Sequence, residues 1–165
     1  MKRSVRGFTL IELVVAITVI AILAAVALPR YINLQSQARV AKLSAIYGSV
    51  RSASALAKAQ CQVDLAGLNQ TTNPSVAPCT RTGGTIDMDG TRIAMVNQYP
   101  AASGQGILAA AQINPQVDQV TVTVAGNVVT IAVNGGNPPN CQFTYAESIA
   151  PGQSPVLSTP ATTDC

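Results

Sequence analysis

The sequence predicts an α+β protein in which one long N-terminal helix packs against a small antiparallel β-sheet head. Two observations lead to this prediction. An apolar run over residues 8–28 is followed by an amphipathic segment that continues to about residue 59. The second half of the chain contains short β-branched segments separated by glycine, proline and asparagine. The chain has 165 residues, which is enough for one such helix and one modest domain.

The first 28 residues have the charge and hydropathy of a membrane-inserted segment. Residues 1–7 are basic and end in Gly7, and residues 8–28 are apolar apart from two threonines and Glu12. A helix of this length spans roughly 31 Å, about the thickness of a bilayer core. Because the basic side chains come first, we expect residues 1–7 to stay in the cytoplasm and the head to be exported. The alternative is an ordinary secretory signal cleaved near residues 24–27, which the length of the apolar run disfavours.

Glu12 is a carboxylate inside this apolar segment. Inserting a charge there costs on the order of 2.5–3.5 kcal/mol, so Glu12 is a functional candidate unless it reaches the membrane interface. Cleavage between Gly7 and Phe8 would create an α-amine at Phe8. This cation can neutralise a carboxylate in surroundings of low dielectric constant. The pair could form within one helix or between staggered neighbouring helices.

The stretch GFTLIELVVAITVIAILAAVALPRY, residues 7–31, resembles the class III leader and helix start of bacterial type IV pilins. The resemblance implies the type IV pilin fold, with residues 1–7 as a leader peptide. It also implies cleavage by a prepilin peptidase after Gly7 and N-methylation of Phe8. The resemblance further implies that Glu12 recognises the Phe8 amine of an adjacent subunit during assembly. Residues 29–50 are more narrowly similar to mannose-sensitive haemagglutinin-type pilins.

The function implied by the resemblance is that of a structural subunit of a pilus filament, for adhesion or motility. Its expected partners are copies of itself, the prepilin peptidase and methylase, the assembly machinery of the inner membrane, and the membrane before assembly. The precursor would lie in the inner membrane with its head in the periplasm, and the mature chain in an extracellular filament. The alternatives are a type II secretion pseudopilin or a minor pilin of a DNA-uptake pilus. A membrane-anchored adhesive binding module is an alternative from a different class.

Pro29 follows the apolar run, where it is expected to kink or end the helix. Beyond it, apolar residues recur at helical spacing up to residue 59, which favours continuation. We therefore expect one helix over residues 8–59, bent near Pro29. Its amphipathic half, residues 29–59, should pack its apolar stripe against the head. That stripe comprises Leu43, Ile46, Tyr47, Val50, Ala53 and Ala57.

Four cysteines follow the apolar run. An even number of cysteines behind a membrane-targeting segment favours an oxidising compartment and two disulfides. No C-x-x-C pair is present, which disfavours zinc. We expect Cys61–Cys79 to close a proline-containing loop. We expect Cys141–Cys165 to close a second loop, which resembles the disulfide-bounded region of pilins; four cysteines allow three connectivities, and the other two stay open.

The head, residues 60–165, should be mostly β-structure. An Asp-Gly step between apolar flanks predicts a hairpin, and alternating or β-branched runs predict further strands. We also expect a short helix over residues 104–113 and a loose Pro/Ser/Thr-rich tail over residues 150–164. The segments expected to form strands are 85–96, 119–124, 128–133 and 142–146.

Composition argues against catalysis and nucleic-acid binding. The chain has no histidine, no activated cysteine arrangement and no Gly-rich phosphate loop, so no enzyme activity and no cofactor are expected. The Asp87–Gly90 stretch resembles part of a calcium loop but lacks the later ligands, so a turn is expected and no metal. The net charge of +3 comes from the leader, and the head has two arginines against six acids.

Charge is segregated along the chain. Residues 30–59 contain five basic side chains and no acid, whereas the head is acidic. This distribution suggests ion pairs between the basic stem of one subunit and the acidic head of another. Single surface pairs are weak, so only several together would matter.

Overall fold

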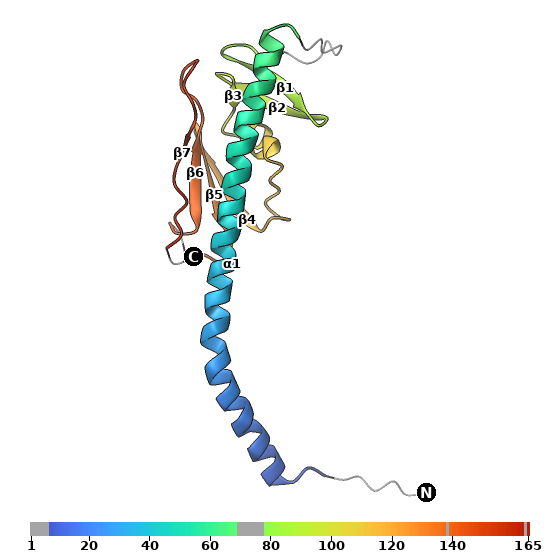
Figure 1. Ribbon diagram of the computed structural model, residues 1–165, viewed down its shortest axis with the longest axis vertical. Coiled ribbons are helices and arrows are strands. Elements are labelled where there is room, and N and C mark those ends of the chain that lie inside the picture. Colours follow the sequence, from blue (N-terminus) through green and yellow to red (C-terminus); the bar gives the residue numbers. More distant parts are fainter. Residues whose placement is uncertain (1–6, 69–77, 138, 164) are drawn as a thin grey trace, which may run out of the picture. The chain divides into compact units, whose positions relative to one another are not determined.

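The computed structural model describes residues 7–68, 78–137, 139–163 and 165. The chain divides into two compact units, residues 1–38 and residues 39–165. Helix α1 (Leu10–Leu65) contributes its first part to one unit and its second part to the other. Figure 1 shows the order of the elements along the chain. Most of the expected leader and part of the loop between Cys61 and Cys79 lie outside the described residues.

Residues 10–38 of the first unit form a continuous helical segment. Pro29 lies inside α1, and the residues on both sides of it are helical. Figure 1 shows this segment curving within the unit. The expectation of helix on both sides of Pro29 is therefore confirmed, and the proline does not end the helix.

The C-terminal end of α1 is closed by a Schellman motif. Gly67 has a φ of 69°, a left-handed conformation that glycine adopts without steric cost. The Leu68 N–H donates to the Val63 carbonyl at 3.2 Å, and the Gly67 N–H donates to the Asp64 carbonyl at 3.0 Å. Because this stop lies at Gly67, the helix runs to Leu65 and not only to about residue 59 as expected.

The second unit contains the rest of α1 and two antiparallel sheets, which lie along it in Figure 1. One sheet is three-stranded, in the order β1-β2-β3, and the other is four-stranded, in the order β4-β5-β6-β7. The predicted α+β fold with antiparallel strands is confirmed. The strands are β1 (Gly83–Met88), β2 (Thr91–Val96), β3 (Tyr99–Pro100), β4 (Val120–Ala125), β5 (Val128–Val133), β6 (Gln142–Ala146) and β7 (Val156–Leu157).

Both predicted hairpins are present, and each has a two-residue turn. β1 and β2 are joined around Asp89 and Gly90, which both have positive φ, at 55° and 75°. This pair of left-handed residues is typical of the turns that match strand twist. β4 and β5 are joined through Gly126 and Asn127, and of these two only Gly126 has a positive φ, at 55°.

The apolar stripe of α1 packs against both sheets and so joins them. Leu43 and Val50 are buried with residues of β4, β5 and β6. Ala53 and Ala57, further along the same stripe, are buried with residues of β1 and β2. The small alanine side chains allow the three-stranded sheet to approach the helix closely.

The tail over residues 150–164 was expected to be loose, but its residues 156–157 and 161 pair with the four-stranded sheet. β7 pairs with β6, and Gln142 forms a further bridge with Ala161. The tail thereby covers the backbone edge of β6, which would otherwise be unpaired. The composition of the tail favours irregular structure, and pairing across the sheet overrides that local preference.

The expected short helix over residues 104–113 is shorter: it consists of the helical turn η1 (Gly104–Leu108) and the two helical residues that follow it. Gly106, at its centre, has non-helical angles of φ −98° and ψ −108°. A Cβ at this position would lie 2.1 Å from the Ala101 carbonyl oxygen. Only glycine therefore fits the close approach that this turn makes to the chain before it.

Candidate functional site

Helix α1 begins with a reciprocal hydrogen-bonded cap between Thr9 and Glu12. The Glu12 backbone N–H donates to the Thr9 hydroxyl at 3.3 Å. The Glu12 Oε2 atom accepts hydrogen bonds from the Thr9 backbone N–H at 3.0 Å and from its hydroxyl at 2.8 Å. This is a capping box, which satisfies two backbone donors that a helix start leaves unpaired. It explains why the helix begins at Leu10 and not at Phe8, where it was expected.

Thr9 is a site residue that sequence analysis missed. Its signal is present, because Thr9-Leu10-Ile11-Glu12 has the spacing of a capping box in front of an apolar run. From the sequence pattern, Glu12 is identified only as a charge in an apolar segment. The structure adds a second role, since the carboxylate also fixes the first turn of α1.

In this structure the Phe8 nitrogen forms no hydrogen bond with the Glu12 side chain. The Phe8 nitrogen is an amide there, because Gly7 is still attached, and it therefore has no positive charge. Among the described residues only Thr9 forms a hydrogen bond with the Glu12 side chain, and both bonds end on Oε2. The second carboxylate oxygen of Glu12 is therefore available to a group from outside the described chain.

Gly7 has no structural reason to be glycine in this fold. A Cβ built at Gly7 meets nothing within 4 Å, and the residue does not have a left-handed φ. Packing and backbone geometry would both accept a larger side chain. Within the described residues, the fold itself therefore gives no reason for glycine at this position.

The segment behind this cap exposes a large apolar surface. The bulky hydrophobic side chains of residues 8–28 are exposed by between 43% at Val14 and 82% at Phe8. α1 contains a stretch long and apolar enough to cross a membrane, and none of that stretch is buried. Apolar surface of this extent is unfavourable in water, so it needs a lipid or protein environment.

The structure contains two disulfides, both in the second unit. Cys61 is joined to Cys79 with a Cα–Cα distance of 5.3 Å, and Cys141 to Cys165 with a distance of 5.0 Å. These are the two pairs named from the sequence. The first joins the last turns of α1 to the segment before β1, and the second joins the start of β6 to the end of the tail. All four cysteines are buried.

The residues Asp87–Gly90 form a turn. The Asp87 side chain accepts a hydrogen bond from the Gly90 N–H at 2.9 Å, which closes the β1–β2 hairpin. In the described ranges there is no group of three or more histidine, cysteine or acidic side chains that could hold a metal ion.

Comparison with known proteins connects the N-terminal site to a defined class of segment. Residues 2–28 match a family model described as a prokaryotic N-terminal methylation motif. The match covers Gly7 and Phe8, the capping box and the exposed apolar segment. Over residues 2–28 this chain is therefore similar to proteins that have this methylation motif, and here the motif lies at the start of a long apolar helix.

Two curated relatives are similar over the same part of the chain. The chain is 47% identical over 57 residues to the type IV narrow pilus major component PilA5 of Thermus thermophilus, which is 34% of this chain and 49% of that protein. It is 42% identical over 53 residues to the type IV major fimbrial protein FimA of Dichelobacter nodosus, which is 32% of this chain and 34% of that protein. The chain thus spans about half the length of the first relative and a third of the second. No solved structure gives a significant match.

Proposed function

We propose that this chain is the precursor of a structural subunit of a type IV pilus, which polymerises through residues 8–28. The observation that supports this most directly is the Thr9–Glu12 cap at the start of an unburied apolar helix, one residue after the Gly7–Phe8 bond. The methylation motif supports the processing, and the printed names of the relatives support a pilus. Because residues 29–50 are similar to mannose-sensitive haemagglutinin-type pilins, we propose that the pilus is of this type.

Maturation would convert the Phe8 nitrogen from an uncharged amide to a cationic amine. A prepilin peptidase hydrolyses the Gly7–Phe8 amide: the hydroxyl of water joins the Gly7 carbonyl carbon to give a carboxylate, and a hydrogen joins the Phe8 nitrogen to give an amine. N-methylation of that amine leaves it cationic at neutral pH. The cleavage also removes Lys2, Arg3 and Arg6, which hold the leader on the cytoplasmic side.

Assembly would then join Phe8 of one subunit to Glu12 of a staggered neighbour. The free oxygen of the Glu12 carboxylate accepts a hydrogen bond from the methylated amine, while Oε2 keeps its two hydrogen bonds from Thr9. In a medium of low dielectric constant such a pair is far stronger than in water. Within the bilayer the helices gain little from leaving lipid, so this pair and close packing drive association. Outside the membrane, the hydrophobic effect holds the same helices together.

The proposed partners and location follow from this route. The precursor is a membrane protein of the inner membrane, with its leader in the cytoplasm and its head in the periplasm. It meets the peptidase and methylase there, and then the assembly machinery. The mature chain is part of an extracellular filament that serves adhesion or motility. The two disulfides suit the oxidising compartment through which the head passes.

Intact mass and N-terminal sequencing of protein sheared from the cell surface test the proposal. The expected chain starts at N-methyl-Phe8 and is two hydrogens lighter for each of the two disulfides. A chain that keeps Met1, or that starts after residue 27, would show that the proposed leader is wrong. Finding the Phe8-processed chain only in membranes would contradict the pilus role and favour a pseudopilin or a minor pilin.

A further inference from the structure

A groove with two cations and no acid lies in the second unit, between α1 and the C-terminal tail. It measures about 480 Å³ and is lined by Arg51 and Lys58 of α1, by Tyr99, and by the tail residues Ser154 and Leu157. Arg51 precedes Lys58 by seven residues, or two helical turns, so both side chains project from the same side of α1. The hydroxyls of Tyr99 and Ser154 add neutral polar groups to the lining of the groove.

Lys58 is held in place at the floor of this groove. Its Nζ donates a hydrogen bond to the Tyr99 hydroxyl at 2.8 Å and lies 4.8 Å from the centre of the Tyr99 ring. The Tyr99 hydroxyl is also 3.0 Å from the Ser154 hydroxyl. None of these partners is negatively charged, so the charge of Lys58 is oriented but not neutralised.

Arg51 is the second cation of the groove. It is exposed, and it forms no hydrogen bond or ion pair with any residue that the structure describes. A guanidinium and an ammonium on one side of a groove, with hydroxyls beside them, are suited to bind a carboxylate through charge-assisted hydrogen bonds. The groove therefore has the chemistry of a carboxylate site whose carboxylate is not supplied by the described part of the same chain.

One acid of the head matches this requirement. Asp89 lies at the tip of the β1–β2 hairpin, is exposed, and has no side-chain partner in the described ranges. The other described acids of the head all have partners: Asp87 accepts from Gly90, Asp118 from Asn114, Glu147 from Ala102, and Asp64 has an interaction of its own. Asp89 is therefore the free carboxylate on the described surface of the head.

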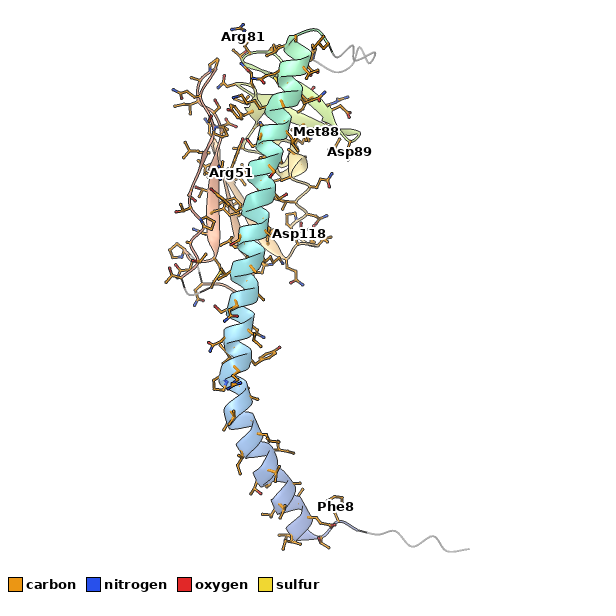
Figure 2. The ribbon with its side chains drawn as sticks, in the orientation of Figure 1. Phe8, Arg51, Arg81, Met88, Asp89 and Asp118 are labelled. Atoms are coloured by element: carbon orange, nitrogen blue, oxygen red, sulfur yellow. A yellow bond between two sulfur atoms is a disulfide. The ribbon has the colours of Figure 1, made fainter. Side chains whose placement is uncertain are left out.

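Arg51 and Asp89 cannot meet within one chain. Figure 2 shows them on the two sides of α1, with Asp89 at the outer end of the hairpin. Two complementary patches on different sides of a subunit produce a heterologous contact, in which each copy binds the next. Such contacts repeat without closing when the rotation does not form a ring, which is the geometry of a filament.

The charge balance of the mature chain favours such a contact. Of the ten basic residues, three are in the leader, so seven remain against seven acids. The mature chain would thus have no net charge, but its basic groove and Asp89 lie on different parts of the head. Two copies attract one another when the groove of one meets Asp89 of the other, and they repel one another when two grooves meet.

We propose that the groove formed by Arg51 and Lys58 binds the Asp89 carboxylate of a second copy of this chain. This rests on the proposed function, because the two copies meet as neighbours in the filament. The groove is then an interface that selects the register between neighbouring heads, in addition to the contact made by the N-terminal helices.

A charge swap in the full-length chain tests this contact. Arg51→Glu and Asp89→Lys should each lower the yield of sheared filaments about fivefold or more, since the contact repeats at every subunit. The double variant Arg51→Glu/Asp89→Lys should restore the yield to near that of the unaltered chain. Arg81→Glu, which reverses another exposed arginine of the head, is the matched control and should leave the yield unchanged.

A second set of variants covers the case in which Asp89→Lys fails to fold, since Asp89 has a left-handed backbone that lysine tolerates less well. Asp89→Asn keeps the turn and removes the charge, and Arg51→Gln does the same for the helix. Each should lower the yield, and the double variant should be no worse than either single one, because both remove the same pair.

Unchanged yield in the single variants, absence of rescue in the swap, or additive losses in the neutral pair would each overturn the proposal. Its failure is distinguishable from failure of the proposed function. In the latter case the unaltered chain itself would give no filaments that start at Phe8.

Discussion

Arg39 donates a hydrogen bond from its guanidinium to the main-chain oxygen of Cys165, at 2.5 Å. The two residues are 126 positions apart in the sequence. Arg39 is half-buried on α1, and this bond gives its charged group a partner at that position. Together with the Cys141–Cys165 disulfide, it holds the end of the tail against both the helix and the four-stranded sheet.

Replacing Arg39 with methionine should destabilise the head by roughly 1.5–3 kcal/mol, because a half-buried hydrogen bond to a charged group is lost and its acceptor is left unpaired. Thermal unfolding of the purified chain in detergent, followed by circular dichroism, measures the effect. Lys42→Met is the matched control, since Lys42 has no partner among the residues described. Equal melting temperatures for the two variants would contradict the structural role of Arg39.

Replacing Gly7 with phenylalanine should block processing and leave the fold intact. The structure has open space at Gly7, so a new side chain meets nothing. We expect cleavage to slow on the order of tenfold or more, because a peptidase must hold the scissile bond in a narrow range of positions. The precursor-to-mature ratio on a gel measures this change. Gly48→Ala, at another glycine with open space, should be processed normally; normal processing of both variants would argue against cleavage after Gly7.

Replacing Glu12 with glutamine should separate the two roles of this residue. Glutamine also forms capping boxes, so the start of α1 should be preserved. It has no charge to bind the Phe8 amine, so filaments should be lost while cleavage at Gly7 continues. Electron microscopy of cell-surface filaments and the mass of the membrane-bound chain measure the two effects.

Thr9→Ala is the control for the Glu12 variant. It removes the cap, at a cost of about 0.5–2 kcal/mol to the helix start, and leaves the carboxylate free to bind the amine. Filaments should therefore still form. If Thr9→Ala abolished filaments and Glu12→Gln did not, capping and not charge would be the role of Glu12 in assembly.

Replacing Gly106 with alanine should destabilise the head by about 1–3 kcal/mol. The added methyl group would overlap the Ala101 carbonyl oxygen, which is 2.1 Å from the ideal Cβ position, so the backbone must shift. Gly104→Ala, two residues away, meets nothing within 4 Å and should unfold at an unchanged temperature. Thermal unfolding of both variants in detergent gives the comparison, and similar destabilisation of both would show that the close approach at Gly106 is not tight.

Much of the architecture follows from local patterns in the sequence. The 3.6-residue period of the apolar stripe predicts the part of α1 that packs on the sheets, and Leu43 and Val50 are buried as that period requires. The alternation in β4 and the Asp89-Gly90 turn predict their hairpins, because each depends on residues close together in the chain. The N-terminal site is local as well, since Gly7, Phe8, Thr9 and Glu12 lie within six consecutive positions.

The sequence by itself thus determined the helix, the principal strands and the position of the N-terminal site. Only the tertiary structure decided how distant segments meet. It paired the tail with β6, divided the strands into two sheets and brought Arg39 to Cys165. It also placed Lys58 beside Tyr99, which is 41 residues further along the chain. Tyr99 in turn lies beside Ser154, a further 55 residues along. Local periodicity reflects which face of a segment is buried, whereas these contacts depend on how the whole backbone closes around its core.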